Sequence, residues 1–76
     1  MSPKLPRVTA RELLGALRKD GWLDLRQRGS HLVLTHPDKP GLVVVRMHAG
    51  RGVAAGTLRT ILRQAGLSAD DLQSLL

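Results

Sequence analysis

Apolar residues recur at helical spacing in the first third of the chain, beginning shortly after Thr9. Thr9 and Glu12 stand three residues apart and can form a capping box, in which each side chain binds the other residue's backbone amide. Gly21 can adopt the left-handed conformation that ends many helices. The pattern therefore predicts an amphipathic helix between Thr9 and Gly21, whose buried stripe comprises Leu13, Leu14 and Leu17. Residues 1–8 are expected to form an extended arm.

Residues 22–28 alternate between apolar and polar side chains, which is the pattern of a half-buried strand. Leu23 and Leu25 are expected on its buried face, and its other face is expected to carry Asp24, Arg26 and Arg28. Gly29-Ser30 marks a corner before a second strand. That strand places Leu32 and Leu34 on one face, and the opposite face carries His31, Val33 and Thr35.

A third strand is predicted from Leu42 to His48, after a turn at residues 36–41 that is rich in strand-breaking residues. If its buried residues are Val43, Val45 and Met47, its open face carries Val44, Arg46 and His48 beside His31. A glycine-rich connection at residues 49–56 then leads to a second helix, which begins at Thr57 or just before it and ends at Gly66. The buried stripe of that helix comprises Leu58, Ile61, Leu62 and Ala65, and Ser68 can cap a short third helix that carries Leu72, Leu75 and Leu76.

The predicted element order is a helix, three strands, a helix and a short helix. Short turns between the strands imply an antiparallel sheet, and its apolar face needs a cover that the amphipathic helices supply. We therefore expect a single α+β domain over residues 1–76, with a three-stranded antiparallel sheet and two helices packed on one face. The open sheet face would carry Arg26, Arg28 and His31, with His48 as a further candidate.

The chain carries a net charge of +6 on 76 residues, and such a surface attracts polyanions. RNA, DNA, an acidic protein and membrane lipid are all compatible with this charge, as is simple solubility. The only aromatic residue is Trp22, which argues against a single-strand binder that stacks bases on rings and favours a core position for this side chain. The absence of cysteine excludes disulfides and a cysteine nucleophile. With no apolar run long enough to span a bilayer and no signal-like N-terminus, the expected location is cytoplasmic, without membrane association.

The imidazole of His31 is the strongest candidate for chemistry, because it can exchange a proton near neutral pH and follows a polar corner beside arginines. RNA contains its own nucleophile, the 2′-hydroxyl, so a base with cations that hold the phosphate suffices to cleave it. A histidine at a strand start is also commonly an ordinary surface residue. Three histidines among scattered carboxylates do not predict a metal site.

Several residues could bind the phosphate groups of RNA. Arg26 and Arg28 can donate two parallel hydrogen bonds each, and Ser30 can donate a further one. His48 could act as a second acid or orienting group. Thr57 lies at a helix start, where free backbone amides suit an anion, and Arg51 could reach the same anion. A solvated strand face, a turn and a helix cap explain the same residues equally well.

The chain resembles the HicA toxin family over roughly residues 9–70. The resemblance is carried by Gly21-Trp22, Arg26, Gly29-Ser30-His31, His36-Pro37 and the segment from Gly56-Thr57-Leu58 to Ala65-Gly66-Leu67, in that order. It implies a fold similar to double-stranded-RNA-binding domains and a toxin that cleaves messenger RNA. It also implies that activity needs His31, that a HicB antitoxin is the partner, and that no metal cofactor takes part.

Two positions depart from the pattern of that family. Arg46 stands where members often have a proline, and Ala55 stands where they often have a lysine before Gly-Thr-Leu. Arg51 and Arg59 are alternative cations for the contact that this lysine would make. The sequence as a whole predicts a metal-independent endoribonuclease toxin of a type II toxin–antitoxin pair, with mRNA and HicB as partners. A non-catalytic module that binds double-stranded RNA is the main alternative, and a protein-docking subunit is another.

Overall fold

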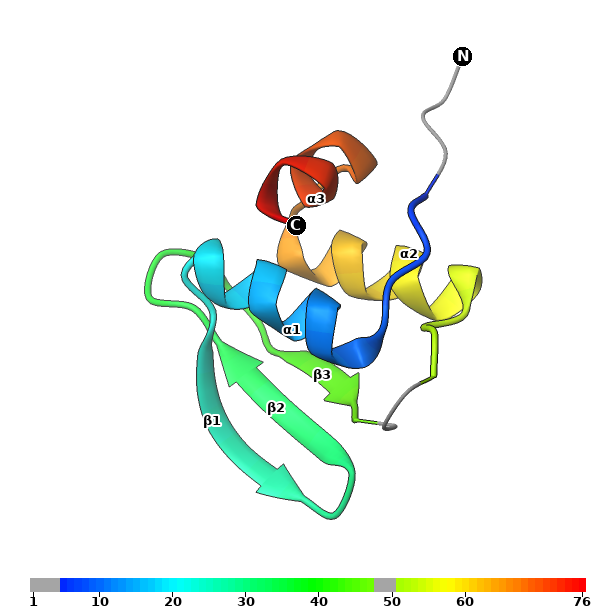
Figure 1. The fold of residues 1–76 in the computed structure, drawn as a ribbon. Coiled ribbons are helices and arrows are strands. Elements are labelled where there is room, and N and C mark those ends of the chain that lie inside the picture. The colour runs from blue at the N-terminus through cyan, green and yellow to red at the C-terminus, as the bar shows by residue number, and fades with distance from the viewer. Residues whose placement is uncertain (1–4, 48–50) are drawn as a thin grey trace.

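The computed structural model describes residues 5–47 and 51–76 and confirms the predicted α+β class. The elements in chain order are α1 (Ala10–Lys19), β1 (Leu23–Arg28), β2 (His31–Thr35), β3 (Val43–Arg46), α2 (Ala55–Ala65) and α3 (Ala69–Leu75). The strands form one antiparallel sheet in the order β1-β2-β3. In Figure 1, α1 and α2 cover the same face of this sheet, and α3 lies beyond them. The arrangement is compatible with a double-stranded-RNA-binding-domain-like fold.

Local hydrogen bonds and backbone conformation explain the starts of α1 and α3 and the end of α2. The predicted capping box of α1 is present, because the Glu12 amide donates to the Thr9 hydroxyl at 3.1 Å and the Thr9 amide donates to the Glu12 carboxylate at 2.9 Å. A second capping box joins Ser68 and Asp71 at the start of α3. By contrast, α2 begins after Ala54 without a side-chain cap and ends at Gly66, which has a φ of 68°. The first turn of α2 therefore leaves backbone amides without side-chain acceptors.

The core lies between the helices and the sheet. Its largest fully buried side chain is Trp22, which confirms the predicted core position of the single aromatic residue. Val8 is also buried, and its carbonyl accepts a hydrogen bond from the Val53 amide at 2.8 Å. The end of the predicted arm is thus tied to the segment before α2. The other fully buried large side chains are Leu13, Leu17, Leu34, Leu58, Leu72, Val43 and Val45, all within predicted elements.

The predicted burial of Leu23 and Leu25 is wrong, since their side chains are 57% and 53% exposed. The cause is an irregularity in the pairing of β1 with β2, where Asp24 lies opposite Leu34 but Arg26 lies opposite Val33. One extra residue reverses the alternation of faces along a strand. Leu25 is the unpaired residue, and Leu23 consequently lies on the open face opposite Thr35.

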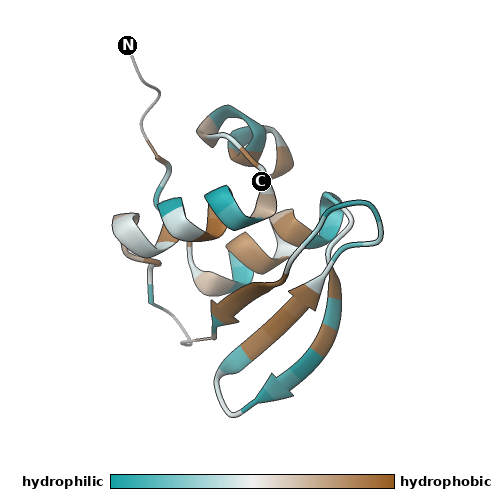
Figure 2. Ribbon diagram, turned by 180° about the vertical axis from the view of Figure 1, so that it is seen from behind, coloured by the Kyte–Doolittle hydropathy of each residue, from teal (hydrophilic) through white to brown (hydrophobic). Residues whose placement is uncertain are grey.

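The same irregularity turns Asp24 toward the helices. Its carboxylate accepts two hydrogen bonds from Arg18 of α1, at 2.6 and 3.2 Å. This hydrogen bonding raises the pKa of the Arg18 guanidinium above its usual value. All six residues of β1 are exposed, and in both views the outer end of this strand projects past the helices (Figures 1 and 2). Apart from the salt bridge between Asp24 and α1, the edge strand β1 is therefore exposed to solvent on both faces.

Candidate functional site

The centre of the candidate site is a row of three side chains across the open sheet face. His31 begins β2, and its register partners are Arg28 on β1 and Arg46 on β3. Side chains directly opposite one another in antiparallel strands lie on the same face. Leu32, the next residue of β2, points into the core, so the His31 row points away from the helices. All three side chains in the row are exposed.

His31 is hydrogen-bonded to one of these arginines. The Nε–H group of Arg46 donates to the Nε2 atom of His31 at 3.0 Å. Arginine has donors but no acceptor, so Nε2 must be the unprotonated nitrogen of the ring in this contact. The neutral imidazole then carries its proton on Nδ1. The contact fixes both the tautomer and the direction of the ring.

The structure brings several other predicted site residues to the same face. Arg26 lies opposite Val33, on the open face and two residues along β1 from Arg28. Ser30 stands in the corner before His31, and its carbonyl accepts a hydrogen bond from the Met47 amide at 2.6 Å. This bond ties the corner to the end of β3. The β1–β2 corner and the end of β3 are thus held together beside His31.

Two adjoining hollows connect this row to the start of α2. One is lined by His31, Val44, Arg46 and Thr57. The second is also lined by Arg46 and Thr57, together with Arg51, Gly52, Val53, Ala54 and Ala10. Arg46 and Thr57 therefore line both hollows. The uncapped first turn of α2, which has no acidic residue, lies at this second hollow, and its free amides add positive potential there.

Two predicted site residues are not part of this group. Arg59 is exposed on α2 and lines neither of the two hollows. His48 falls outside the residues that the structure describes.

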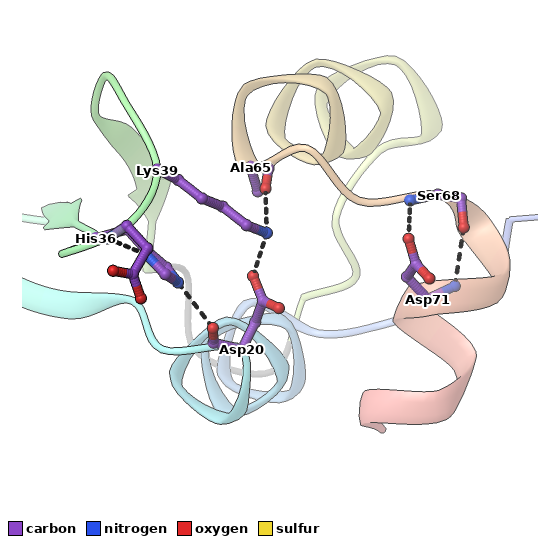
Figure 3. A network of polar contacts seen from close by, with 7 residues as sticks. Asp20, His36, Lys39, Ala65, Ser68 and Asp71 are labelled. Atoms are coloured by element: carbon purple, nitrogen blue, oxygen red, sulfur yellow. Dashed lines mark hydrogen bonds and ion pairs between the residues drawn. The ribbon is translucent and has the colours of Figure 1, made fainter.

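His36 serves the fold. Its Nε2–H group donates to the Asp20 carbonyl at 2.8 Å, and its Nδ1 atom accepts from the Asp38 amide at 3.0 Å (Figure 3). The ring packs edge-on against Trp22, with 5.1 Å between ring centroids. Lys39 extends this network, since its ammonium donates to the Asp20 carboxylate at 2.6 Å and to the Ala65 carbonyl at 2.9 Å. The predicted turn is thus joined to the ends of α1 and α2.

Comparison with models of protein families shows which family this chain belongs to. The family model described as the HicA toxin of bacterial toxin–antitoxin matches residues 10–67. The chain belongs to the HicA toxin family. It is therefore a toxin component of a toxin–antitoxin system. Membership of this family implies an antitoxin partner. No curated protein matches the chain.

The HicA match encloses every candidate residue named above. Within the described residues of this HicA chain, no group of three or more His, Cys, Asp and Glu side chains could hold a metal ion. No helix of the described part is long and apolar enough to cross a bilayer.

One residue of the site was missed as a candidate from the sequence. The alternation predicted for the third strand places Arg46 on the open face with His31, but the sequence gives it no role at the site. Its direct bond to the imidazole depends on the register of β2 with β3, which the sequence pattern does not specify. The available signal was a cation at an open-face position beside His31.

Proposed function

We propose that this HicA toxin is an endoribonuclease that cleaves messenger RNA without a metal, with His31 as the residue that moves the proton. The observation that carries the proposal is the exposed His31 imidazole between Arg28 and Arg46 on an open face. Such an arrangement combines a group that exchanges protons near neutral pH with cations that attract a phosphodiester. The net charge of +6 supports a polyanionic substrate.

The proposed reaction uses the nucleophile that RNA carries. His31 takes the proton of the ribose 2′-hydroxyl, and the oxygen attacks the adjacent phosphorus. The bond from phosphorus to the 5′-oxygen breaks, and this leaving oxygen takes a proton from water or from a second acid, for which His48 is the candidate. The products are a 2′,3′-cyclic phosphate and a free 5′-hydroxyl. General acid–base catalysis of this kind contributes about 10²–10⁴-fold to a rate.

The phosphate groups would be bound from two sides of His31. Arg26, Arg28 and Ser30 lie on the β1 side, at or before the corner that leads into β2. On the other side, Arg51 and Thr57 line the hollow at the start of α2. Arg59, one helical half-turn beyond Thr57, would meet RNA outside this hollow. Contacts on both sides suit a chain of phosphates that passes over the open sheet face.

The partner proposed for this toxin is a HicB antitoxin that covers the open sheet face. This face presents the partly exposed apolar side chains of Leu23 and Val44 next to the arginine row. Apolar residues with a basic rim suit a partner that buries an apolar patch and brings acidic side chains. An antitoxin bound there would exclude RNA from His31.

The test compares wild-type protein with His31→Ala and His31→Gln on messenger RNA in the presence of a metal chelator. Because His31 is exposed, the free energy of unfolding of both variants should lie within about 0.5 kcal/mol of the wild-type value. Both should lose RNA cleavage by about 10²-fold or more. The glutamine variant retains an amide that can bond Arg46, so its loss of activity would point to proton transfer. Cleavage at the wild-type rate in either variant would refute the role of His31.

A non-catalytic module for double-stranded RNA is the second candidate, favoured by the dsRBD-compatible fold and the basic charge. It predicts that purified protein binds duplex RNA, loses affinity steeply as salt rises, and leaves the RNA intact. The products of the chelator experiment separate the two candidates. New RNA ends would exclude the binding module, and intact RNA with a salt-dependent complex would support it.

A further inference from the structure

We propose that Arg46 is a positioning residue: it holds His31 with Nε2 unprotonated and releases this nitrogen when a phosphate group binds. This inference rests on the proposed function, since it concerns the same site. It adds Arg46 to the residues that the proposed function uses. The Arg46–His31 hydrogen bond of 3.0 Å is its starting observation.

The backbone places Arg46 where it can act on both the ring and a phosphate. Its Cα lies directly opposite that of His31 in the β2–β3 ladder, so the two side chains leave the sheet side by side. The bond uses the Nε–H group, which leaves the two outer nitrogens of the guanidinium available. Arg46 also lines both hollows, one shared with His31 and one with Arg51 and the start of α2.

The chemistry of the two side chains determines which one donates and which tautomer of His31 the contact stabilises. A guanidinium remains protonated in proteins and can only donate, so it stabilises the tautomer in which Nε2 has a free electron pair. That electron pair is what a base needs to take the 2′-hydroxyl proton. In the free protein, however, Arg46 occupies it. The ring is therefore correctly oriented but not yet available.

Binding of a phosphodiester would exchange the partners of Arg46. Phosphate oxygens are stronger acceptors for a guanidinium than a neutral imidazole, and they can accept two parallel hydrogen bonds from it. When Arg46 turns to the phosphate, Nε2 of His31 becomes free beside the substrate. The same movement places a positive charge where negative charge develops during the attack. Substrate binding and release of the base are thus coupled through one side chain.

Two substitutions separate the hydrogen bond from the charge. In Arg46→Gln, the amide nitrogen stands at the same distance along the side chain as the Nε of arginine, so hydrogen bonding is kept without the charge, but the amide oxygen can also accept from a protonated Nε2. In Arg46→Met, a methyl group stands there, so both are lost. Arg63→Met is the matched control, because Arg63 is an exposed arginine in the last turn of α2, away from the site.

The first readout is the ¹⁵N spectrum of His31 in the free protein, at a pH where the ring is neutral. Wild type and Arg63→Met should both show a protonated Nδ1 and an unprotonated Nε2, whereas Arg46→Gln, whose amide can donate or accept, should show both tautomers. Arg46→Met should show a mixture, with Nε2 protonated in a large fraction of molecules. A protonated Nε2 in wild type, or an unchanged spectrum in Arg46→Met, would overturn the positioning role. This readout requires no RNA cleavage, so it is independent of the proposed function.

The second readout tests the exchange of partners. A short 2′-O-methyl RNA, which cannot attack its own backbone, is added to wild-type protein. The Nε–H signal of Arg46 should shift. The ¹⁵N signal of Nε2 of His31 should also shift, because the hydrogen bond from Arg46 is broken. If RNA binds while both signals stay unchanged, the exchange is refuted. If no RNA binds at low salt, the exchange and the proposed nuclease both fail, but the tautomer spectrum still decides whether Arg46 positions His31.

Kinetics complete the test where cleavage is observed. Both Arg46 variants should raise KM by about tenfold or more, because each loses a charged contact to phosphate. The two variants should have similar kcat values, because Arg46 has already left His31 in the complex with substrate and both variants lack its charge. A kcat clearly lower for Arg46→Met than for Arg46→Gln would show that residue 46 still holds His31 in that complex, which contradicts the exchange. Arg63→Met should retain wild-type kcat and a KM close to wild type.

Discussion

At the scale of single residues, Gly21 joins the end of α1 to the turn that follows β2. Its φ is 108°, a conformation that other residues rarely adopt. A Cβ atom at this position would lie 2.7 Å from Nε2 of His36. That nitrogen donates to the Asp20 carbonyl in the network of Figure 3, so a larger residue would disturb both the backbone and the hydrogen bond. The glycine is therefore needed for space as well as for conformation.

We expect Gly21→Ala to lower the free energy of unfolding by about 1–3 kcal/mol. The matched control is Gly15→Ala in α1, where an added Cβ meets no atom within 4 Å. This control should raise stability by about 0.5–1 kcal/mol, since alanine is the better helix former. Urea unfolding of the two variants measures both effects. Equal stability of Gly21→Ala and wild type would show that the turn adjusts freely to the added methyl group.

The residue scale also shows how far the sequence leads to the site. The Gly-Ser-His corner and the alternation of β2 place His31 on the open face, as predicted. The hydrogen bond from Arg46 depends on how side chains of two strands are placed relative to each other, and the hydrophobic period of a strand does not predict this placement. Sequence reasoning finds which residues share a face, because the strand period is two. It does not find which of them touch, because that depends on register and rotamer.

At the scale of elements, helices were easier to predict than the edge strand. The capping box at Thr9 and the cap at Ser68 depend on residues close in sequence and form as expected, and at Ser68 the structure shows a full capping box with Asp71. The faces of β1 depend on unbroken alternation, which the irregularity near Leu25 interrupts. The Arg18–Asp24 salt bridge accompanies the reversed faces. It joins residues of two different elements, so the sequence pattern of neither element predicts it.

The capping box of α3 predicts a local response to acid. Hydrogen bonds from the Ser68 amide and the Ser68 side chain lower the pKa of Asp71 below its usual value of 3.8. A depressed folded-state pKa means that the charged carboxylate stabilises the fold above pH 3.8 and that this contribution is lost as pH falls through the folded-state pKa. We expect α3 to fray over this range, as measured by the amide chemical shifts of its first turn.

Asp71→Asn should remove that acid response and loosen the start of α3 already at neutral pH, because the amide is a weaker acceptor than the carboxylate. Asp70→Asn is the charge-matched control, since Asp70 is in the same turn but outside the capping box. It should retain the acid response of wild type. An identical pH dependence in Asp71→Asn and wild type would contradict the assignment of this response to the cap.

At the scale of the whole molecule, one sheet face is covered by helices and the other is open. The open face combines the His31 row with the exposed side chain of Leu23, which the irregularity in β1 turned away from the helices. A leucine exposed by 57% on a sheet contributes little to the fold. Its position beside a basic row fits a surface that a protein partner buries, as proposed above for the antitoxin.

The antitoxin proposal predicts the effect of a polar residue at this position. We expect Leu23→Ser to weaken binding of a HicB antitoxin by about tenfold or more, since a buried leucine side chain contributes roughly 1.5–3 kcal/mol. Stability should stay within about 0.5 kcal/mol of wild type because the side chain is exposed in the free toxin. Leu76→Ser is the matched control, because Leu76 is similarly exposed at 45% but lies at the end of α3, away from the sheet. Calorimetric titration of each toxin with the antitoxin gives the affinities. Equal affinities for Leu23→Ser and Leu76→Ser would place the antitoxin elsewhere on the toxin, and RNA would then have to be excluded from His31 by some means other than direct cover.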